Sequence, residues 1–349
     1  MDNSKYGKYK TAFLAAGALI VLLEIPGAIG VLTQPYDGFW IEPGYAIIRV
    51  VPDSPAQRAG LMVGDILKSI DGIEVKDSKA LARHPNPKVG ETRAYVVERN
   101  GKAVSLDLKF SGLPAREIVL GFAYAAIGFC ILICGLWVYL KVQTGSTTLL
   151  AMASLCFGFG LMNAPNLDSY ALRLIYWSVR NVVELAGLAT MLHFLMAFPK
   201  PKAWLERNHT LFVLYGPASL AALFVLFLIL LQPEGTSALN NVTNILLGVL
   251  WVAYVAAAVI ALAHSYVKAN REERTAYGLH VLLLGTVIGL LPVLITVSVS
   301  VVAPKVVLPG AEFYELTTVL VPFSVAQAVM RKERIIGSPV VSWATATGS

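Results

Sequence analysis

Polar side chains inside an apolar segment offer the most distinctive chemistry in this sequence. Arg180, Asn181 and Glu184 lie close together on a predicted helix, and His193 follows further along the same helix. Charged side chains within a membrane span are costly, so they normally face a bundle interior or a wet cavity. Arg180 and Glu184 are also spaced to pair on one helix face. This intramembrane polar cluster is therefore either a structural pair that orients the helix or a ligand or signalling site.

Two further carboxylates fall near this cluster in the predicted topology. Glu24 lies in the first apolar segment, and Glu315 comes just before the last one. Both would approach the outer leaflet, as Arg180 does. The sequence leaves open whether they contact it, and His193 alone is more typical of a packed polar residue than of a ligand.

The motifs of familiar hydrolases are missing from the sequence. Membrane metalloproteases of the site-2 type need His-Glu-x-x-His on a helix, and none of the five histidines has a Glu-x-x-His partner. The spans also contain no Gly-x-Ser-x-Gly or Gly-x-Ser-Gly serine motif, and no phosphate-binding glycine loop is present. We therefore expect no catalytic residue, no metal and no cofactor, so that the chain is not an enzyme.

The elements that must position the polar cluster are long apolar helices. Of the 349 residues, 56% are hydrophobic and 14% are charged, whereas a soluble domain is about 25% charged. A transmembrane helix needs about 20 apolar residues. Eight segments approach this requirement: Thr11–Leu32, Ile118–Leu140, Thr147–Met162, Leu174–Phe198, Leu211–Leu231, Ile245–Val267, Leu279–Val302 and Leu316–Met330. The sequence thus predicts a multi-span α-helical membrane protein with about eight transmembrane helices.

Basic residues indicate the orientation of these helices. With a cytoplasmic N-terminus, each inner connection is basic, whereas the short outer loops hold little beyond Arg173 and Lys305. Residues 34–112 are not counted, because long domains cross the membrane regardless of their charge, and the pattern obeys the positive-inside rule. The inner basic residues are Lys141, Lys200, Lys202, Arg207, Lys268, Arg271, Arg274, Arg331, Lys332 and Arg334. We expect a bacterial inner-membrane protein with both termini cytoplasmic and residues 34–112 outside. The net charge of +6 reflects this topology, and no basic and aromatic array predicts nucleic-acid binding.

The first apolar segment allows two interpretations. Lysines precede it, and small residues near Ala28-Ile29-Gly30 would suit a signal-peptide cleavage site. The apolar run continues past a normal signal sequence, which favours an uncleaved anchor. Either interpretation leaves residues 34–112 outside the cytoplasm.

Residues 34–112 have the pattern of a small soluble α/β domain. β-branched runs alternate with turn signals, and two dipeptides favour tight hairpins. The predicted elements are a strand at Tyr45–Val51, a capped short helix at Ser54–Leu61, a strand at Ile66–Ile70 followed by Asp71-Gly72, a second helix at Ser78–His84, and two strands flanking Asn100-Gly101.

These motifs resemble the PDZ domains of secreted bacterial proteases. The resemblance rests on Ser54-Pro55-Ala56, Ala59-Gly60-Leu61, Gly64-Asp65-Ile66-Leu67 and Asp71-Gly72. It implies that an extended peptide, often a protein C-terminus, adds as a strand beside the second helix.

The resemblance also assigns the peptide-binding residues. Gly44, Tyr45, Ala46 and Ile47 would form the loop whose N–H groups receive a terminal carboxylate, and Leu81 would line the side-chain pocket. The usual third residue of this loop is glycine, and alanine is less free at unusual dihedral angles. The alternative is that Tyr45, Ile47 and Leu81 simply form the domain core.

Two motifs in the apolar region resemble the sensor region of competence-pheromone-type membrane histidine kinases and related phosphatases. They are Leu192–Pro201 and Val321–Arg331. In that family the last span leads into a kinase or phosphatase domain, whereas only a short segment follows Met330 here. The resemblance implies a truncated sensor module or a receptor that uses a separate effector.

The sequence thus favours a membrane sensor or receptor that binds an extracytoplasmic peptide and signals to a cytoplasmic kinase- or phosphatase-type effector, with membrane lipid as its surroundings. A non-catalytic scaffold or protease adaptor is the alternative, and a transporter is a third class. The expected parts are a first helix within 1–33, the PDZ domain at 34–112, a seven-helix membrane domain at 113–332 and a tail at 333–349.

Overall fold

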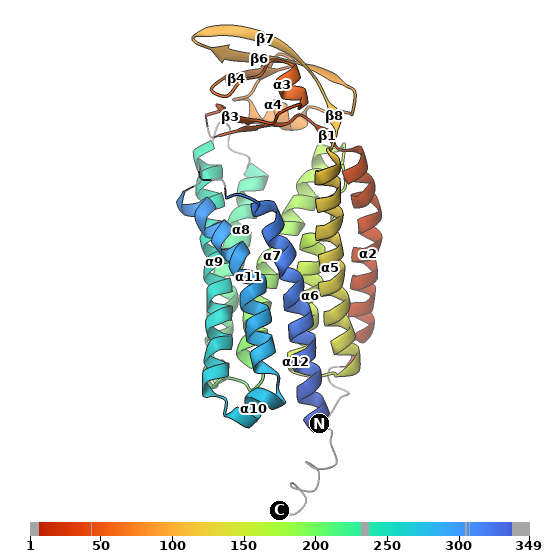
Figure 1. The fold of residues 1–349 in the computed structure, drawn as a ribbon, viewed down its shortest axis with the longest axis vertical. Helices are drawn as coiled ribbons and strands as arrows, with labels where there is room; N and C mark the ends of the chain where they lie inside the picture. Colours follow the sequence, from red (N-terminus) through yellow and green to blue (C-terminus); the bar gives the residue numbers. More distant parts are fainter. Residues whose placement is uncertain (1–6, 43, 232–236, 304–305, 307, 337–349) are drawn as a thin grey trace, which may run out of the picture.

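The computed structural model describes residues 7–42, 44–231, 237–303, 306 and 308–336. A small α/β domain caps one end of a long helix bundle (Figure 1). The first helix of the bundle leads into this domain and the next helix leads out of it. The expected multi-span helical protein with one small α/β domain between its first two spans is confirmed. Most of the expected tail, residues 337–349, lies outside the described residues.

The strands of the small domain are all antiparallel where the structure describes them. They are β1 Pro35–Tyr36, β2 Phe39–Ile41, β3 Ile47–Val50, β4 Ile66–Ile70, β5 Ile73–Glu74, β6 Thr92–Arg99, β7 Lys102–Lys109 and β8 Ser111–Gly112. They form a four-stranded sheet in the order β5-β4-β6-β7 and two pairs, β1-β8 and β2-β3. A bridge between Ala46 and Ile66 joins the β2-β3 pair to β4.

The two predicted hairpin turns form for the expected reason. Asp71 and Gly72 connect β4 to β5 with φ angles of 49° and 79°, and Asn100 and Gly101 connect β6 to β7 with 51° and 75°. Positive φ at both central residues matches the twist of the flanking strands. These turns fix the register of the sheet.

Two short helices close the small domain. α3 spans Pro55–Arg58, and the hydroxyl of Ser54 caps it by accepting from the N–H of Gln57 at 3.3 Å. α4 spans Ser78–Arg83 and is capped by the side chain of Asp77. Both caps satisfy N–H groups that the first turn of a helix leaves free. The predicted helices are therefore present.

An apolar core and one ion pair hold the small domain together. Ile47 and Leu108 are among its fully buried side chains. The carboxylate of Asp65 is 2% exposed and accepts two hydrogen bonds of 2.7 Å from the guanidinium of Arg99. It also accepts from the N–H of Met62 at 2.9 Å. The hydrogen bonds from Arg99 hold the pKa of Asp65 below its usual range.

The membrane domain is built from long helices joined by short connections. They are α2 Lys10–Thr33, α5 Ala115–Lys141, α6 Gly145–Leu161, α7 Tyr170–Ala197, α8 Thr210–Leu231, α9 Ser237–Lys268, α10 Arg271–Ala276, α11 Leu279–Val302 and α12 Leu320–Ile336, with the 3₁₀ segments η1 Ala203–Glu206 and η2 Ala311–Val319. Among the described residues, seven helical segments are long and apolar enough to cross a membrane. The eighth expected span, α6, is apolar but shorter, with 17 residues.

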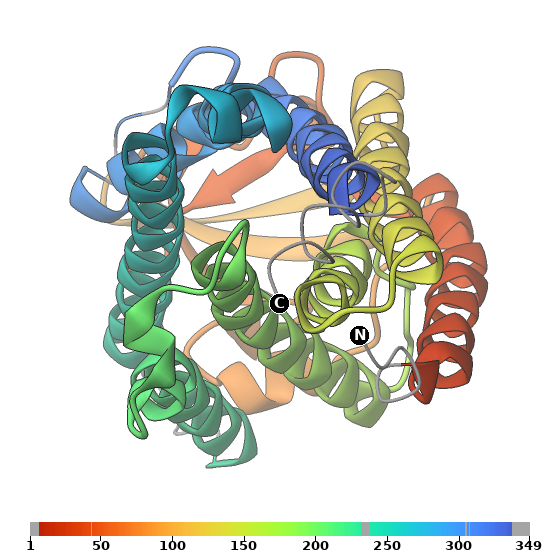
Figure 2. The same cartoon turned by 90° about the horizontal axis from the view of Figure 1, so that it is seen from below.

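The helices do not contribute equally to the bundle. Viewed from the end opposite the small domain, α2 lies at the periphery beside α5, while α6 lies inside against α7 (Figure 2). α7, α8, α9, α11 and α12 share one apolar core. The last span begins as the 3₁₀ segment η2, so only its second half is α-helix.

A buried carboxylate fastens the peripheral helix α2. Glu24 is 8% exposed and accepts from the backbone N–H of Asn163 at 3.0 Å and from its Nδ2 at 2.7 Å. Gly27 lets the backbones approach, because a Cβ there would lie 2.3 Å from the carbonyl oxygen of Asn163. The structure thus gives Glu24 a packing role at the loop between α6 and α7.

Candidate functional site

The small domain meets the membrane domain through two attachments. Directly beyond α2 and before α5, β1 and β8 pair as a stem, with Pro35 opposite Gly112. On the other side, Nδ2 of Asn86 donates to Oδ1 of Asn166 at 3.2 Å and to the carbonyl of Leu167 at 3.4 Å. The second attachment holds the end of α4 over the start of α7.

An arginine fixes the end of α4 at this junction. Arg93 of β6 is 7% exposed, and its Nη1 lies 2.6 Å from Nδ1 of His84, the residue that follows α4. Its Nη2 donates to the carbonyl of Pro85 at 2.5 Å, and its Nε donates to Glu91 at 3.0 Å. Because the guanidinium is buried and each of its three nitrogens has a partner, it fixes where the chain leaves α4.

A cavity of about 340 Å³ lies between α4 and the start of α7. Its lining residues are Leu81, His84, Asn86, Tyr170, Arg173, Leu174 and Trp177. We call it the junction pocket. Trp177 is 49% exposed, so an aromatic face is available to a bound chain. Of the predicted peptide-binding residues, Leu81 lines this pocket.

The other four predicted peptide-binding residues lie apart from the junction pocket, at the turn between β2 and β3. The N–H of Tyr45 donates to the backbone carbonyl of Glu42 at 2.9 Å, and the N–H of Ile47 donates to the backbone carbonyl of Asp65 at 2.8 Å. Ile47 is 1% exposed, in the domain core. Gly44 and Tyr45 have positive φ angles of 100° and 66°. Two of the N–H groups expected to receive a carboxylate thus already have backbone partners, one within the turn and one at the residue that precedes β4.

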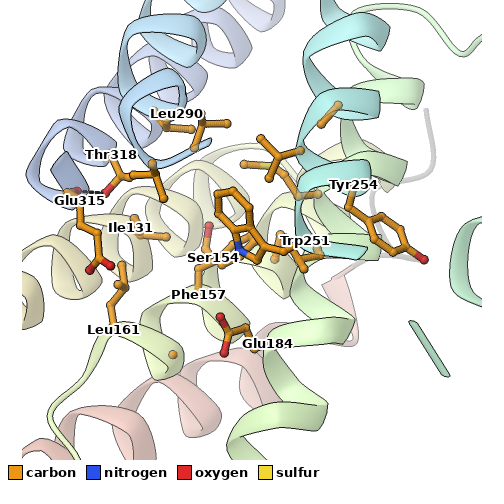
Figure 3. Close-up of a pocket in the computed structure, with 18 of the residues that line it drawn as sticks. Ile131, Ser154, Phe157, Leu161, Glu184, Trp251, Tyr254, Leu290, Glu315 and Thr318 are labelled. Carbon is orange, nitrogen blue, oxygen red and sulfur yellow. Dashed lines mark hydrogen bonds between the residues drawn. The ribbon is translucent and has the colours of Figure 1, made fainter. Parts of the chain in front are cut away.

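A second, larger cavity lies inside the membrane domain. Its volume is about 570 Å³, within the range typical of small-molecule sites. We call it the membrane cavity. Its polar lining residues include Tyr124, Ser154, Arg180, Asn181, Glu184, Thr286, Glu315 and Thr318. Figure 3 shows several of these side chains around Phe157 and Trp251. The cavity therefore gathers polar groups from helices that are far apart in the sequence.

Arg180 does not pair with Glu184 as the helix spacing predicts. Its Nη1 donates to the carbonyl of Met162 at 3.1 Å and to the hydroxyl of Tyr176 at 3.2 Å, and its Nη2 donates to the carbonyl of Gly160. The last carbonyls of a helix lack intrahelical partners and carry partial negative charge. The guanidinium of Arg180 therefore hydrogen-bonds to the carbonyls at the end of α6 instead of pairing with Glu184.

The predicted polar cluster is only partly brought together. Arg180, Asn181 and Glu184 line the membrane cavity, and Glu315 joins them. His193 is absent from the lining, and its Nδ1 lies 3.1 Å from the hydroxyl of Tyr215 on α8. His193 is thus placed as a packed polar residue.

Sequence reasoning missed the junction residues Asn86, Tyr170 and Trp177 and the cavity residues Trp251 and Thr286. Tyr170 and Trp177 carried a usable signal, since aromatic residues at the start of a span are typical of a membrane interface. The others carried none, because their role depends on distant helices.

Comparison with known proteins supports the PDZ assignment. Residues 27–110 match the PDZ domain family. The chain is 32% identical over 97 residues to the "putative zinc metalloprotease" of Mesorhizobium japonicum, which covers 28% of this chain and 26% of that protein. It is also 32% identical over 96 residues to a "probable periplasmic serine endoprotease DegP-like" of Brucella suis, covering 25% and 19%. A Pseudomonas putida protein of the same description is 32% identical over 79 residues, covering 22% and 17%.

These findings correct the functional expectations drawn from the sequence. The chain spans about a quarter or less of the length of these relatives. All of them are described as proteases, so the interpretation as a sensor or receptor and the interpretation as a non-enzyme are both wrong on this comparison. The resemblance to histidine kinases and the kinase- or phosphatase-type effector find no support, whereas the PDZ resemblance is confirmed.

The metal named in one relative can be tested against this chain. Catalytic zinc sites use three protein ligands. Within the described parts of the chain, no three His, Cys, Asp or Glu side chains lie close enough to hold a metal ion. Zinc therefore does not fit the described residues, and we derive no step through it.

Proposed function

We propose that this chain is a membrane-embedded protease, in which the PDZ domain selects an extended polypeptide and holds it at the membrane domain. The observation that carries the proposal is the junction pocket, which joins α4 of the PDZ domain to the start of α7. The protease relatives support the reaction class. The substrate class is an unfolded or extended polypeptide.

The arrangement of the PDZ domain suits such a substrate. PDZ domains bind a peptide as an added strand beside the second helix. In the described part of the domain, β2 pairs only with β3, which leaves its other edge for a further strand. Leu81 of α4 lies in the junction pocket, so a chain that follows α4 reaches Tyr170 and Trp177 of α7.

The same proposal places the PDZ domain outside the cytoplasm. The connections α5–α6, α7–α8 and α9–α11 lie at the bundle end opposite the PDZ domain (Figure 1). Basic residues gather there, including Lys141, Lys200, Lys268 and Arg271. Under the positive-inside rule this end is cytoplasmic. An exported or periplasmic polypeptide is then the substrate.

The test is cleavage of fluorescently labelled casein, an unfolded polypeptide, by the full chain in lipid nanodiscs. We expect cleavage by the wild-type protein. Trp177→Ala should raise KM about tenfold with little change in kcat, because the side chain contributes to substrate binding away from the reacting bond. Casein that stays intact with the wild-type protein would show that the chain is not a protease for unfolded polypeptides.

A matched variant controls for the loss of an exposed aromatic residue. Trp137 of α5 is 45% exposed, close to the 49% of Trp177, and does not line the junction pocket. Trp137→Ala should keep the wild-type KM. Equal KM values for the two variants would contradict the role of the junction pocket in binding substrate.

A further inference from the structure

The membrane cavity contains polar groups that nothing in the described structure satisfies. Glu184 of α7 and Glu315 of η2 line it, and Figure 3 shows both carboxylates directed into the cavity. Neither side chain makes a hydrogen bond or a salt bridge to a residue that the structure describes. Glu184 is half-buried, and an ionised carboxylate in an apolar environment normally has a partner.

A buried hydroxyl in the same cavity is also without a partner. Thr286 of α11 is 1% exposed, and its Oγ1 has no hydrogen-bond partner among the described residues. Buried polar atoms in proteins nearly always have one. An orphaned hydroxyl in the same cavity as two unpaired carboxylates indicates that a polar group of a ligand belongs in this space.

The charge of the lining residues indicates whether the polar group of the ligand is a cation or an anion. Among the described lining residues, Arg180 supplies the positive charge and Glu184 and Glu315 the negative charges. The guanidinium of Arg180 is already used by the carbonyls of Gly160 and Met162 and by Tyr176. The lining therefore has an excess negative charge that suits a cation.

The rest of the lining indicates that the uncharged part of the ligand is hydrocarbon. Apolar side chains from α5, α6, α7, α9, α11 and α12 form most of the wall, and the indole of Trp251 is part of it (Figure 3). Indole faces attract ammonium groups, and apolar walls take hydrocarbon. Glu315 is exposed, so the cavity has an entrance on the side of η2.

We propose that the membrane cavity binds an amine-bearing amphiphile. Its ammonium group lies between Glu184 and Glu315, and its hydrocarbon part lies against the apolar wall and Trp251. The site stands apart from proteolysis, because it does not require the PDZ domain or a peptide bond.

The test uses photoreactive dodecylamine with the full chain in lipid nanodiscs, and mass spectrometry locates the labelled residues. We expect saturable labelling of cavity-lining segments of α9 and α11. Excess dodecylamine should compete, whereas dodecanol, which has the same tail without the charge, should compete at least about tenfold less well. Glu184→Gln with Glu315→Gln should reduce saturable labelling at least about tenfold, because the amides keep the shape and remove the charge.

Glu117→Gln is the matched control, since Glu117 is exposed at the start of α5 and does not line the cavity. It should label as the wild type does. Undiminished labelling of the double variant, or equal competition by dodecanol, would overturn the proposal and leave the cavity as an apolar space only. Because the readout is labelling rather than cleavage, its failure is distinct from a failure to cleave casein.

Discussion

The PDZ domain and the membrane cavity differ in how far their polar groups are satisfied by the protein. In the PDZ domain, the carboxylate of Asp65 accepts hydrogen bonds from Arg99. The guanidinium of Arg93 is hydrogen-bonded to His84, Pro85 and Glu91. In the membrane cavity, two carboxylates and the hydroxyl of Thr286 have no hydrogen-bond partner among the described residues.

The difference separates folding from function. A satisfied polar network fixes a single arrangement of the side chains. An unsatisfied polar group inside a protein costs free energy, so its presence calls for an explanation such as a missing ligand. The polar groups of the PDZ domain therefore hold its shape and present α4 to α7. Those of the membrane cavity remain available to a ligand.

The largest effect should come from removing apolar support for the PDZ domain. Leu108 is fully buried in its core, so Leu108→Ala should destabilise the domain by about 2–5 kcal/mol. Hydrogen exchange in nanodiscs should show faster exchange along β6 and β7 and unchanged helices in the bundle. Val63→Ala, at a site that is 65% exposed, should change little. Protection of β6 and β7 equal to that of the wild type would contradict the assigned core.

A smaller loss should follow from removing a satisfied polar group in the membrane domain. Glu24→Ala removes both acceptors of Asn163, and a hydrogen bond to a charged group contributes about 1.5–3 kcal/mol. The amide of Asn163 should lose its protection from exchange. The exposed Glu117→Ala should leave that amide protected, and the same change in both variants would show that Glu24 does not fasten α2.

Two threonines in the bundle should respond in opposite directions. Thr190 is 3% exposed and donates to the carbonyl of Ala186 at 2.7 Å, whereas Thr286 is equally buried and has no described partner. Thr190→Val should destabilise the bundle by about 1 kcal/mol, and Thr286→Val should be neutral or stabilising. Thermal unfolding of both variants measures this contrast. A marked destabilisation by Thr286→Val would mean that its hydroxyl is satisfied.

The smallest effect near neutral pH concerns Asp65. Its pKa is lowered in the folded domain by the hydrogen bonds from Arg99. The pair therefore contributes stability that is fully present above the unfolded pKa of about 3.9 and is lost as the pH falls through the lower folded value. In the wild type, the protection of the β4 amides from hydrogen exchange should therefore not change with pH above this range. The Asp65→Asn variant should also show no change with pH there. A wild-type loss of protection beginning near neutral pH would contradict the assignment.

Local chemistry made much of the PDZ domain predictable. Asn100-Gly101 and Asp71-Gly72 specify their turns through backbone geometry, and Ser54 with Pro55 specifies the start of α3. The length and hydropathy of the apolar segments likewise predicted the helices. In each case the signal lies within a few neighbouring residues.

The sites were harder to predict because they depend on tertiary neighbours. Spacing suggested that Arg180 pairs with Glu184, but the carbonyls at the end of α6 compete for the guanidinium, and their position is not visible in the helix pattern. Asn86 and Asn166 are distant in sequence, so no pattern among neighbouring residues predicts the junction pocket. Glu315 was noticed as a charge, but its place beside Glu184 follows from the packing of η2.

Capture of substrate at the junction pocket tests the central claim most directly. A photoreactive amino acid placed at position 177 of the full chain in nanodiscs should cross-link to labelled casein, and excess unlabelled casein should suppress the cross-link. The same residue at position 137 should capture little. Equal capture at the two positions, or none at 177, would contradict the account that the PDZ domain presents a polypeptide to the start of α7.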